Sequence, residues 1–202
     1  MLNNYINEKY LSVKSIKSLK SKFIHGKPFP HLVFKDFFNE LFINEVLNEL
    51  KKENFEHKES DLFSFMQTND LAFSSHNVVG EFYNLLNSKY FKQYLQKITG
   101  ISAFGKIDCS GFIYQSKDYL LPHDDSLEKR EIAYVLNLSK GFLKKDGGLL
   151  NFFNRNKIVR SINSDFNTFT IFKVVPNKTF HQVSEVLVDK QRISISGWFN
   201  AK

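Results

Sequence analysis

Cysteine, proline and long apolar runs are scarce in this chain of 202 residues. The single cysteine, Cys109, cannot form a disulfide within the chain, so we expect a cytoplasmic protein rather than a secreted, cross-linked one. No apolar run approaches the roughly 18 residues of a membrane span, and the polar N-terminus lacks the apolar segment of a signal peptide. We therefore expect neither a membrane partner nor a signal peptide.

Phenylalanine and lysine, by contrast, are abundant. There are 22 Phe residues and 42% of the chain is hydrophobic, so we predict a single domain over residues 28–202 that follows a basic arm over residues 1–27. The net charge is +7, because 28 Lys and Arg residues outnumber 21 Asp and Glu residues. This balance would suit a nucleic-acid or ribosomal partner, but we interpret it first as a lysine-rich composition spread over the surface.

The first half of the chain has the pattern of helices. Pro28 and Pro30 introduce an extended segment over residues 31–34. Apolar residues at helical spacing then predict one helix over 37–53, with Asp36 as its N-cap, and another over 78–98 that ends at Gly100. Between them, residues 54–76 have the mixed composition of a loop, which we predict to be a mobile lid over a pocket.

From residue 104 onward, short apolar segments alternate with turn residues, which is typical of antiparallel strands. The candidate strands are 105–115, 119–123, 131–138, 149–153, 157–162, 168–175, 179–188 and 191–199. We predict a mainly β fold with N-terminal helices, an α+β protein, in which a helical layer over 28–100 covers a closed β-structure over 104–200.

The chemistry centres on His123 and Asp125, which follow one of these strands. Side chains two positions apart on a strand point to the same face, so this imidazole and this carboxylate can converge. Two such ligands hold a metal weakly, and His181 is the candidate for the third. Two histidines and one carboxylate on one face of Fe(II) leave the opposite positions open for a co-substrate and oxygen.

The last strand carries a second candidate group. Alternation along it places Arg192, Ser194, Ser196 and Trp198 on one face. An arginine that points into a β-structure needs an anion there, and 2-oxoglutarate, held through its far carboxylate by Arg192 and Ser194, would provide one. The alternative is an edge strand whose polar face is exposed to solvent.

Four segments together resemble the iron- and 2-oxoglutarate-dependent oxygenases of the prolyl-hydroxylase type. They are Phe29-Pro30-His31-Leu32-Val33, Asp118-Tyr119-Leu120-Leu121-Pro122-His123-Asp124-Asp125, Asp146-Gly147-Gly148-Leu149 and Arg192-Ile193-Ser194-Ile195-Ser196-Gly197-Trp198-Phe199. The resemblance extends from about residue 28 to the C-terminus and is greatest to the branch that hydroxylates a proline of a ribosomal protein. It implies a double-stranded β-helix (jelly roll) with His123, Asp125 and His181 on iron and Arg192 on 2-oxoglutarate.

The resemblance also implies further residues and products. Tyr114 matches a tyrosine that lines the co-substrate pocket, and Asn137 lies where the family usually has a tyrosine, so one of the two would bind 2-oxoglutarate. Lys117 lies where the family often has glycine. The implied reaction is the hydroxylation of an unactivated C–H bond, most simply that of a prolyl residue, with release of succinate and CO2 and with ascorbate as a reductant.

Two other functions remain open at this point. One is the hydroxylation of a free amino acid or another small metabolite, because the chain has little room for a peptide-binding domain. The other is a jelly-roll binding protein without catalysis. A nucleic-acid substrate is disfavoured, because demethylases of this superfamily usually carry a second arginine six residues after the first, and here that residue is Trp198. The sequence does not indicate the oligomeric state.

Overall fold

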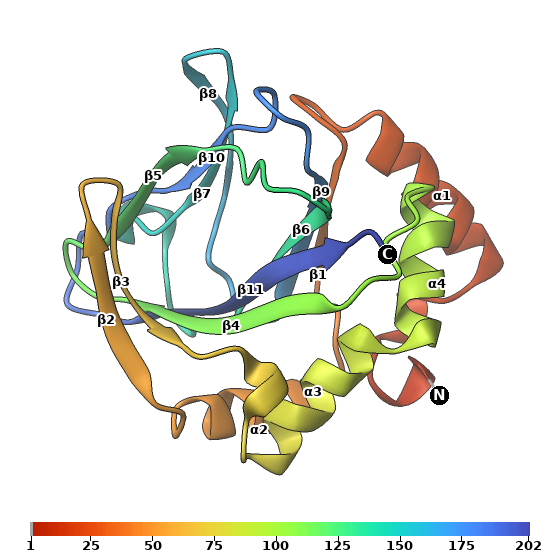
Figure 1. The fold of residues 1–202 in the computed structure, drawn as a ribbon, viewed down its shortest axis with the longest axis horizontal. Coiled ribbons are helices and arrows are strands. Elements are labelled where there is room, and N and C mark those ends of the chain that lie inside the picture. Colours follow the sequence, from red (N-terminus) through yellow and green to blue (C-terminus); the bar gives the residue numbers. More distant parts are fainter. Residues whose placement is uncertain (1) are drawn as a thin grey trace.

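A curled antiparallel sheet with helices on one side forms the protein, as a computed structural model shows for residues 2–202 (Figure 1). The helices are α1 (Val13–Ile24), α2 (Glu40–Leu50), α3 (Asn77–Asn87) and α4 (Lys89–Thr99). The strands are β1 (His31–Lys35), β2 (Phe55–Ser60), β3 (Phe63–Thr68), β4 (Ile107–Tyr114), β5 (Tyr119–His123), β6 (Arg130–Asn137), β7 (Leu150–Asn154), β8 (Lys157–Ile162), β9 (Thr168–Lys173), β10 (His181–Val183) and β11 (Arg192–Asn200). None of the helices within residues 2–202 is long and apolar enough to cross a membrane.

The order of the strands explains how distant residues meet. The sheet runs β1-β9-β6-β11-β4-β3-β5-β10-β7-β8, and β2 pairs with β3 at its side. β11 lies between β4 and β6, so Arg192 is opposite Tyr114 and Ser194 is opposite Asn137. β10 pairs with β5, which places His181 opposite His123. The prediction of a mainly β, jelly-roll fold with N-terminal helices is confirmed.

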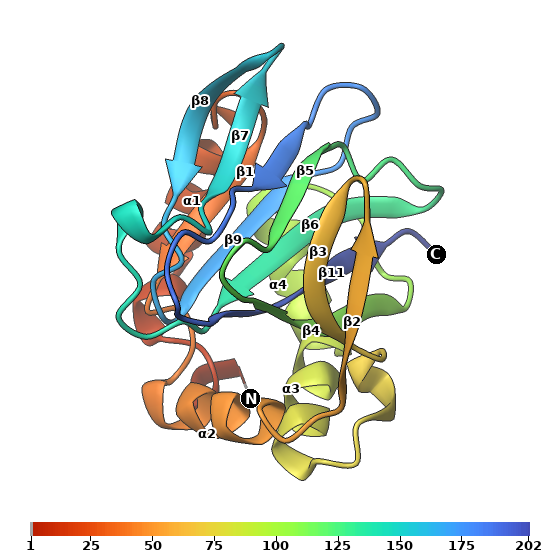
Figure 2. The ribbon, with the colours of Figure 1, turned by 90° about the vertical axis from the view of Figure 1, so that its left-hand side faces the viewer.

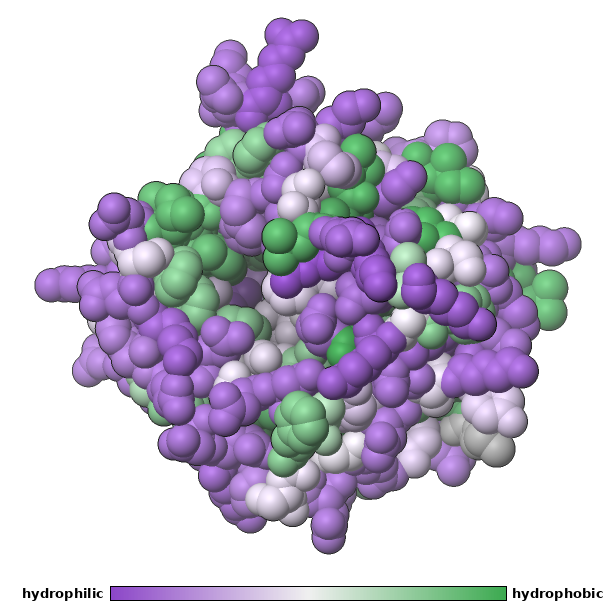
Figure 3. All heavy atoms as spheres, viewed as in Figure 1, coloured by the Kyte–Doolittle hydropathy of each residue, from purple (hydrophilic) through white to green (hydrophobic). Residues whose placement is uncertain are grey.

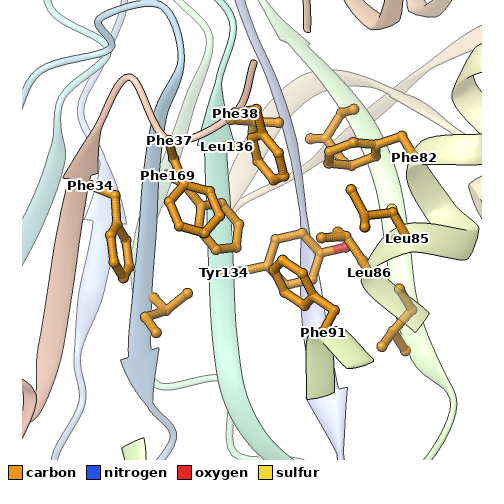
Figure 4. Close-up of a cluster of buried hydrophobic side chains, with 14 of the residues drawn as sticks. Phe34, Phe37, Phe38, Phe82, Leu85, Leu86, Phe91, Tyr134, Leu136 and Phe169 are labelled. Carbon is orange, nitrogen blue, oxygen red and sulfur yellow. The ribbon is translucent and has the colours of Figure 1, made fainter. Parts of the chain in front are cut away.

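The largest part of the core lies between the helices and the sheet. Aromatic side chains dominate it because successive elements each contribute phenylalanines that pack ring against ring (Figure 4). Phe37, for example, stacks on Phe169 of β9 at a centroid distance of 4.9 Å. Phe91 of α4 stacks on Phe199 of β11 at 5.9 Å. This packing fixes one face of the sheet and leaves the other face to surround the site.

The helix ends differ in detail from the predicted ones. α2 begins after Asn39, whose side chain accepts hydrogen bonds from the backbone of residues 41 and 42, so Asn39 and not Asp36 is the N-cap. The predicted helix over 78–98 is two helices, because Ser88 adopts an extended backbone and caps α4. Gly100 ends α4 in the left-handed conformation, as predicted.

Residues 54–76 are not the loop that we predicted from the sequence. They form the β2–β3 hairpin, and β3 pairs with both β4 and β5, so the hairpin is a part of the sheet (Figure 2). The prediction failed because β2 is almost entirely exposed and has no apolar alternation. The strand predicted over 179–188 is also wrong in length, because only His181–Val183 pairs as a strand.

The N-terminal residues are also not a free basic arm. Ile6, Leu19 and Phe23 are buried in the main core, and Phe23 is 2% exposed. Ser12 caps α1, which packs against α4 and β1. Residues 2–24 are therefore an integral part of the folded domain.

Candidate metal and co-substrate site

His123, Asp125 and His181 converge at one point of the pocket. Each offers a ligand atom within 4.8 Å of the others. His123 Nε2 lies 3.3 Å from Asp125 Oδ1, and His181 Nε2 lies 3.2 Å from Asp125 Oδ2. The cluster is the only group of three or more such ligands found within residues 2–202. It has the composition of a two-histidine, one-carboxylate metal site.

Strand alternation alone does not bring Asp125 to His123. β5 ends at His123, and Asp125 adopts a left-handed backbone with φ +59°. That turn, which aspartate tolerates better than most residues, directs the carboxylate back between the two imidazoles. The pairing of β10 with β5 then supplies His181 from the neighbouring strand.

Backbone carbonyls orient both imidazoles. His123 Nδ1 lies 2.9 Å from the carbonyl oxygen of Leu121, and His181 Nδ1 lies 3.0 Å from that of Thr179. A carbonyl oxygen can only accept a hydrogen bond, so each Nδ1 carries a proton and donates it. The lone pair of a neutral ring is then on Nε2, which faces Asp125. Metal-binding histidines are commonly oriented in this way.

The charges of the cluster are stabilised by its own neighbouring groups, against the effect of burial. Desolvation opposes ionisation of Asp125, but the two imidazoles outweigh it and hold the pKa of the carboxyl well below its ordinary value. Desolvation likewise opposes protonation of His123, but its hydrogen bond to Asp125 and the charge of that carboxylate raise its pKa above the ordinary value. The site therefore keeps an anionic carboxylate whose side chain is almost wholly buried.

Asp124 links the segment after β5 to the turn before β10 by hydrogen bonds. Its side chain accepts hydrogen bonds from the backbone N–H of Ser126, at 3.0 Å, and of Asn177, at 2.7 Å. Asn177 belongs to the turn that leads into β10, and Thr179 of this turn holds His181. Asp124 thus connects the segment that carries His123 and Asp125 to the segment that carries His181.

Arg192 is buried in the same pocket, at 1% exposure, without an acidic partner in residues 2–202. Its Nε donates to Gly148 O, at 2.8 Å, and to Ser164 Oγ, at 3.0 Å. Its two terminal nitrogens donate to Ser194 Oγ, at 3.1 Å, and to Asn137 Oδ1, at 3.2 Å. Desolvation lowers the pKa of the guanidinium. Neutral partners alone leave its charge uncompensated, and each terminal nitrogen keeps one N–H for a further acceptor.

Two predicted pocket residues surround this guanidinium. The Tyr114 ring lies 4.9 Å from the guanidinium carbon, and burial raises the pKa of its hydroxyl to about 12. Asn137 is fully buried and positions Arg192 through its side-chain oxygen. The assignment of Asn137 and Tyr114 to the co-substrate stays a prediction.

Gly147 and Gly148 allow the chain to pass close to Arg192. Both have positive φ, and a Cβ on Gly148 would lie 2.9 Å from Arg192 Cδ. A Cβ on Gly147 would lie 2.0 Å from the carbonyl oxygen of Glu185, which no side chain could tolerate. The Asp146-Gly147-Gly148 segment therefore serves to place the Gly148 carbonyl on the arginine.

The pocket encloses about 250 Å³ and has two different walls. One is aromatic and includes Phe63 and Phe65 of the β2–β3 hairpin, whose rings stack at 4.8 Å. The other contains Trp198 with the Arg130 guanidinium 3.3 Å above its ring. The indole N–H of Trp198 is buried and has no hydrogen-bond partner within residues 2–202. Arg192, Ser194, Ser196 and Trp198 all line the pocket, which confirms the inward face of β11.

Sequence reasoning missed three of these contributors. Ser164 lies in a turn whose sequence indicates only a change of direction, and nothing in it shows a contact with Arg192. The Gly148 carbonyl contributes through its backbone, which no side-chain motif reveals. Arg130 is the first residue of β6. Its distance of five residues from Asp125 matches no known motif, so the sequence did not mark it as a pocket residue.

The donor set fits Fe(II) and 2-oxoglutarate. Two neutral imidazole nitrogens and one carboxylate are ligands suited to Fe(II). A dicarboxylate could place one end at this cluster and the other at Arg192, whose charge lacks a fixed acid. Both groups line one cavity, so a single small molecule can contact both.

Comparisons with known proteins agree with this geometry. A family model described as "2OG-Fe(II) oxygenase superfamily" matches residues 109–200. The prolyl 3,4-dihydroxylase OGFOD1 of Ostreococcus tauri is 35% identical over 93% of this chain and 41% of its own length. The prolyl 3-hydroxylase OGFOD1 of Xenopus laevis is 38% identical over 86% of this chain and 35% of its own length. The chain therefore spans only about two fifths of the curated relatives it matches.

Solved structures share the fold. A Pseudomonas putida prolyl-4-hydroxylase aligns with a TM-score of 0.77 and 13% identity, over 93% of this chain and 99% of that one. A Trichoplax adhaerens prolyl hydroxylase in complex with a hypoxia inducible factor peptide fragment aligns with a TM-score of 0.72 and 13% identity, over 93% of this chain and 91% of that one. At such low identity these likenesses establish the architecture alone.

Proposed function

We propose that this chain, which matches the 2OG-Fe(II) oxygenase superfamily over residues 109–200, is an Fe(II)- and 2-oxoglutarate-dependent dioxygenase that hydroxylates a prolyl residue of a protein. One observation carries this proposal. The His123, Asp125 and His181 cluster shares a cavity with Arg192, a buried cation whose partners are all neutral.

The residues of the chain have distinct tasks in this reaction. His123, Asp125 and His181 would hold Fe(II), and Arg192 with Ser194 would hold the far carboxylate of 2-oxoglutarate. When bound, the two groups supply the oxidising chemistry, in which O2 and 2-oxoglutarate give succinate, CO2 and a hydroxylated carbon. Phe63 and Phe65 restrict the access of water to the cavity.

The assignment of a prolyl substrate rests on the named relatives. The Xenopus protein is named for hydroxylation at position 3 of proline and the Ostreococcus protein for positions 3 and 4. We place the new hydroxyl at position 3, which both names share. The unpaired Trp198 indole and the Arg130 guanidinium supply donors for the carbonyl groups of a peptide. We place the substrate in a ribosomal protein, with ascorbate as the reductant, as the sequence resemblance implies. We place the activity in the cytoplasm, where a protein with a single cysteine is expected.

The proposal is tested by measuring succinate release and metal content of the purified protein. The parent protein should retain Fe(II) and release succinate from 2-oxoglutarate in the presence of substrate. Asp125→Ala should lose both, because two neutral imidazoles alone form a poor site for iron. Asp61→Ala, which removes an exposed carboxylate on the β2–β3 turn, is the matched control and should behave like the parent. Equal iron retention in both variants would contradict the assigned ligands.

The substrate is tested separately. Ribosomal proteins from cells with and without this gene should differ by the mass of one oxygen atom on one protein, and fragmentation should place it on a proline. A product formed only from free amino acids would instead support the metabolite hydroxylase.

A further inference from the structure

The positive charge of the chain is concentrated in two segments that contain no acidic residue. Residues 9–35 hold seven lysines, residues 82–107 hold four, and neither contains Asp or Glu. The rest of the chain keeps 17 of the 28 basic residues and all 21 acidic residues, so its net charge is −4. The excess is therefore not spread over the surface, contrary to our first interpretation of the sequence.

The fold brings these two segments together. They contain α1 and α4, which pack against each other at one side of the molecule (Figure 1). Their apolar sides face the core through residues such as Leu19, Phe23 and Phe91. Lys92 of α4 is buried, but the other lysines of the two helices are exposed, as is Lys27 just after α1. We call Lys14, Lys17, Lys20, Lys22, Lys27, Lys89 and Lys97 the α1–α4 lysine face.

The α1–α4 lysine face has no internal neutralisation. All seven side chains are exposed, and none makes an ion pair within residues 2–202. The lysines of the two segments that are paired, Lys9, Lys35 and Lys106, reach acids from other parts of the chain. Seven uncompensated charges on these two helices and the turn after α1 are suited to a partner that is itself a polyanion.

The surroundings of the face favour nucleic acid over a membrane. A membrane-binding helix inserts an apolar side, but the apolar side of α1 is buried, and only Val13 and Ile24 at its two ends are exposed. On the neighbouring helix, Tyr90 is 53% exposed beside Lys89. An exposed aromatic ring among lysines can stack on a base while the lysines contact phosphates. On the face seen in Figure 3, hydrophilic residues predominate and the hydrophobic residues form separate groups.

We propose that the α1–α4 lysine face binds single-stranded RNA through its phosphates, with Tyr90 stacking on a base. Unstacked bases are characteristic of the single-stranded parts of RNA, and a flat pair of helices packed on a core has no element free to enter a DNA groove. The pocket lies on the other face of β11 from these helices, because Ile193, Ile195 and Phe199 pack in the helical core while Arg192, Ser194, Ser196 and Trp198 line the pocket. The inference does not depend on the proposed function.

The test compares two variants of equal charge in the full-length protein. Lys14→Gln/Lys17→Gln/Lys20→Gln removes three charges from the face. Lys144→Gln/Lys145→Gln/Lys157→Gln removes three exposed, unpaired lysines elsewhere. The probe is a fluorescein-labelled oligouridylate of about 20 nucleotides, long enough for a typical single-strand site, and its affinity is measured by anisotropy across a salt series.

We expect the parent to bind, and the salt dependence of log K to become shallower by about 2 in the α1 variant, because each lost phosphate contact removes about 0.7. The control variant should keep the slope of the parent. Tyr90→Leu should weaken binding about tenfold or more without a change of slope. Circular dichroism should show all variants folded.

Three results with nucleic-acid probes would overturn the proposal. They are no binding of the oligouridylate by the parent, equal loss in the two lysine variants, and equal or tighter binding of a DNA duplex of the same length. Vesicles that contain phosphatidylserine form the last arm, and binding to them in preference to RNA would assign the face to membranes.

Discussion

The environment of Arg192 indicates that the pocket binds an anionic ligand. It is charged, buried and surrounded by neutral partners. Breaking one partner of a buried ion pair costs about 3–5 kcal/mol, because the remaining charge is left without compensation. Arg192→Ala should therefore raise the KM for 2-oxoglutarate on the order of a hundredfold or more, with iron affinity unchanged.

The control for this prediction is Arg192→Lys, which keeps the charge but cannot form two parallel hydrogen bonds. Its KM should lie between those of the parent and the alanine variant. Succinate release over a range of 2-oxoglutarate concentrations measures all three. A parent-like KM in Arg192→Ala would move the anchoring role to another residue.

Lys117 is one departure from the family pattern, and its backbone conformation is one that favours glycine. The family often has glycine here, and Lys117 has φ +74°, a backbone conformation that costs a non-glycine residue about 1–2 kcal/mol. Glycine loses more entropy on folding, so Lys117→Gly should stabilise the protein by a net of roughly 0.5–1 kcal/mol. Urea unfolding measures this, with Lys144→Gly as a control in which no stabilisation is expected. A destabilised Lys117→Gly would show that the turn is not strained.

His31, the histidine of the Phe29–Val33 motif, has a structural role and a pH signature. Burial lowers its pKa below the ordinary value, and its Nδ1 donates to Phe29 O at 2.8 Å. Above about pH 6.5 the ring is neutral in both the folded and unfolded states. As the pH falls below that value, the unfolded state takes up a proton that the folded state refuses, so stability decreases.

His31→Gln should remove this contribution and make the free energy of unfolding fall less steeply between about pH 6.5 and 5. The amide of glutamine can still donate to Phe29 O. The exposed His57→Gln is the control and should keep the slope of the parent. Identical slopes in all three proteins would mean that another group causes the loss of stability in acid.

At the scale of residues, the sequence predicted the four charged or metal-ligating side chains that the structure brings into one pocket, but not the neutral groups that hydrogen-bond to Arg192. His123, Asp125, His181 and Arg192 could be predicted because their types, order and spacing are specific to one kind of site. Ser164 and the Gly148 carbonyl could not, because their contacts with Arg192 depend on how β7, β8 and β11 are placed in space. Strand periodicity also did not predict the left-handed backbone conformation of Asp125, which brings its carboxylate to the two histidines.

At the scale of elements, the turn before β10 helps to hold together His123, Asp125 and His181, the proposed metal ligands. Asp124 connects it to the end of β5 through its bond to the Asn177 N–H. Asp124→Ala should lower Fe(II) affinity about 10–100-fold, as loss of a supporting hydrogen bond around metal ligands typically does. Glu128→Ala removes a charge from the same loop without such a bond and is the control.

Titration with Fe(II) under anaerobic conditions measures this prediction, and urea unfolding shows whether the fold is kept. Equal iron affinity in Asp124→Ala and Glu128→Ala would mean that strand pairing alone positions His181.

Strands were predicted where alternating apolar residues or β-branched residues occur in the sequence. They were missed where a segment without such a pattern becomes a strand only because it pairs with a neighbouring strand. The residues of β5 and β8 match the predicted 119–123 and 157–162. β2 consists of Phe55-Glu56-His57-Lys58-Glu59-Ser60, which has no strand pattern, and exists because β3 pairs with it. Tertiary pairing overrides local propensity at such positions.

At the scale of the whole molecule, the N-terminal helix belongs to the core. Phe23→Ala should destabilise the protein by about 3–5 kcal/mol, the usual cost of removing a buried phenylalanine. Ile24→Ala, the neighbouring residue at 53% exposure, is the control and should change stability by about 0.5 kcal/mol or less. Urea unfolding at one pH compares them. Equal stabilities would mean that residues 2–24 can detach without loss of the core.

Amphipathic spacing in α1 was too weak to predict this packing. Lysines and serines occupy most of its positions, and only two of its side chains are buried. The partner surface comes from α4 and β1, which the sequence does not place next to it.

The strand order also determines when the protein can fold during its synthesis. His31 of β1 is paired opposite Phe172 of β9, and β11, the last strand of the domain, lies between β4 and β6. Until residues 192–200 have left the ribosome, the two parts of the main sheet have no strand to join them. Contacts between such distant residues form slowly. The nascent chain therefore exposes many of its phenylalanines until residues 192–200 have left the ribosome.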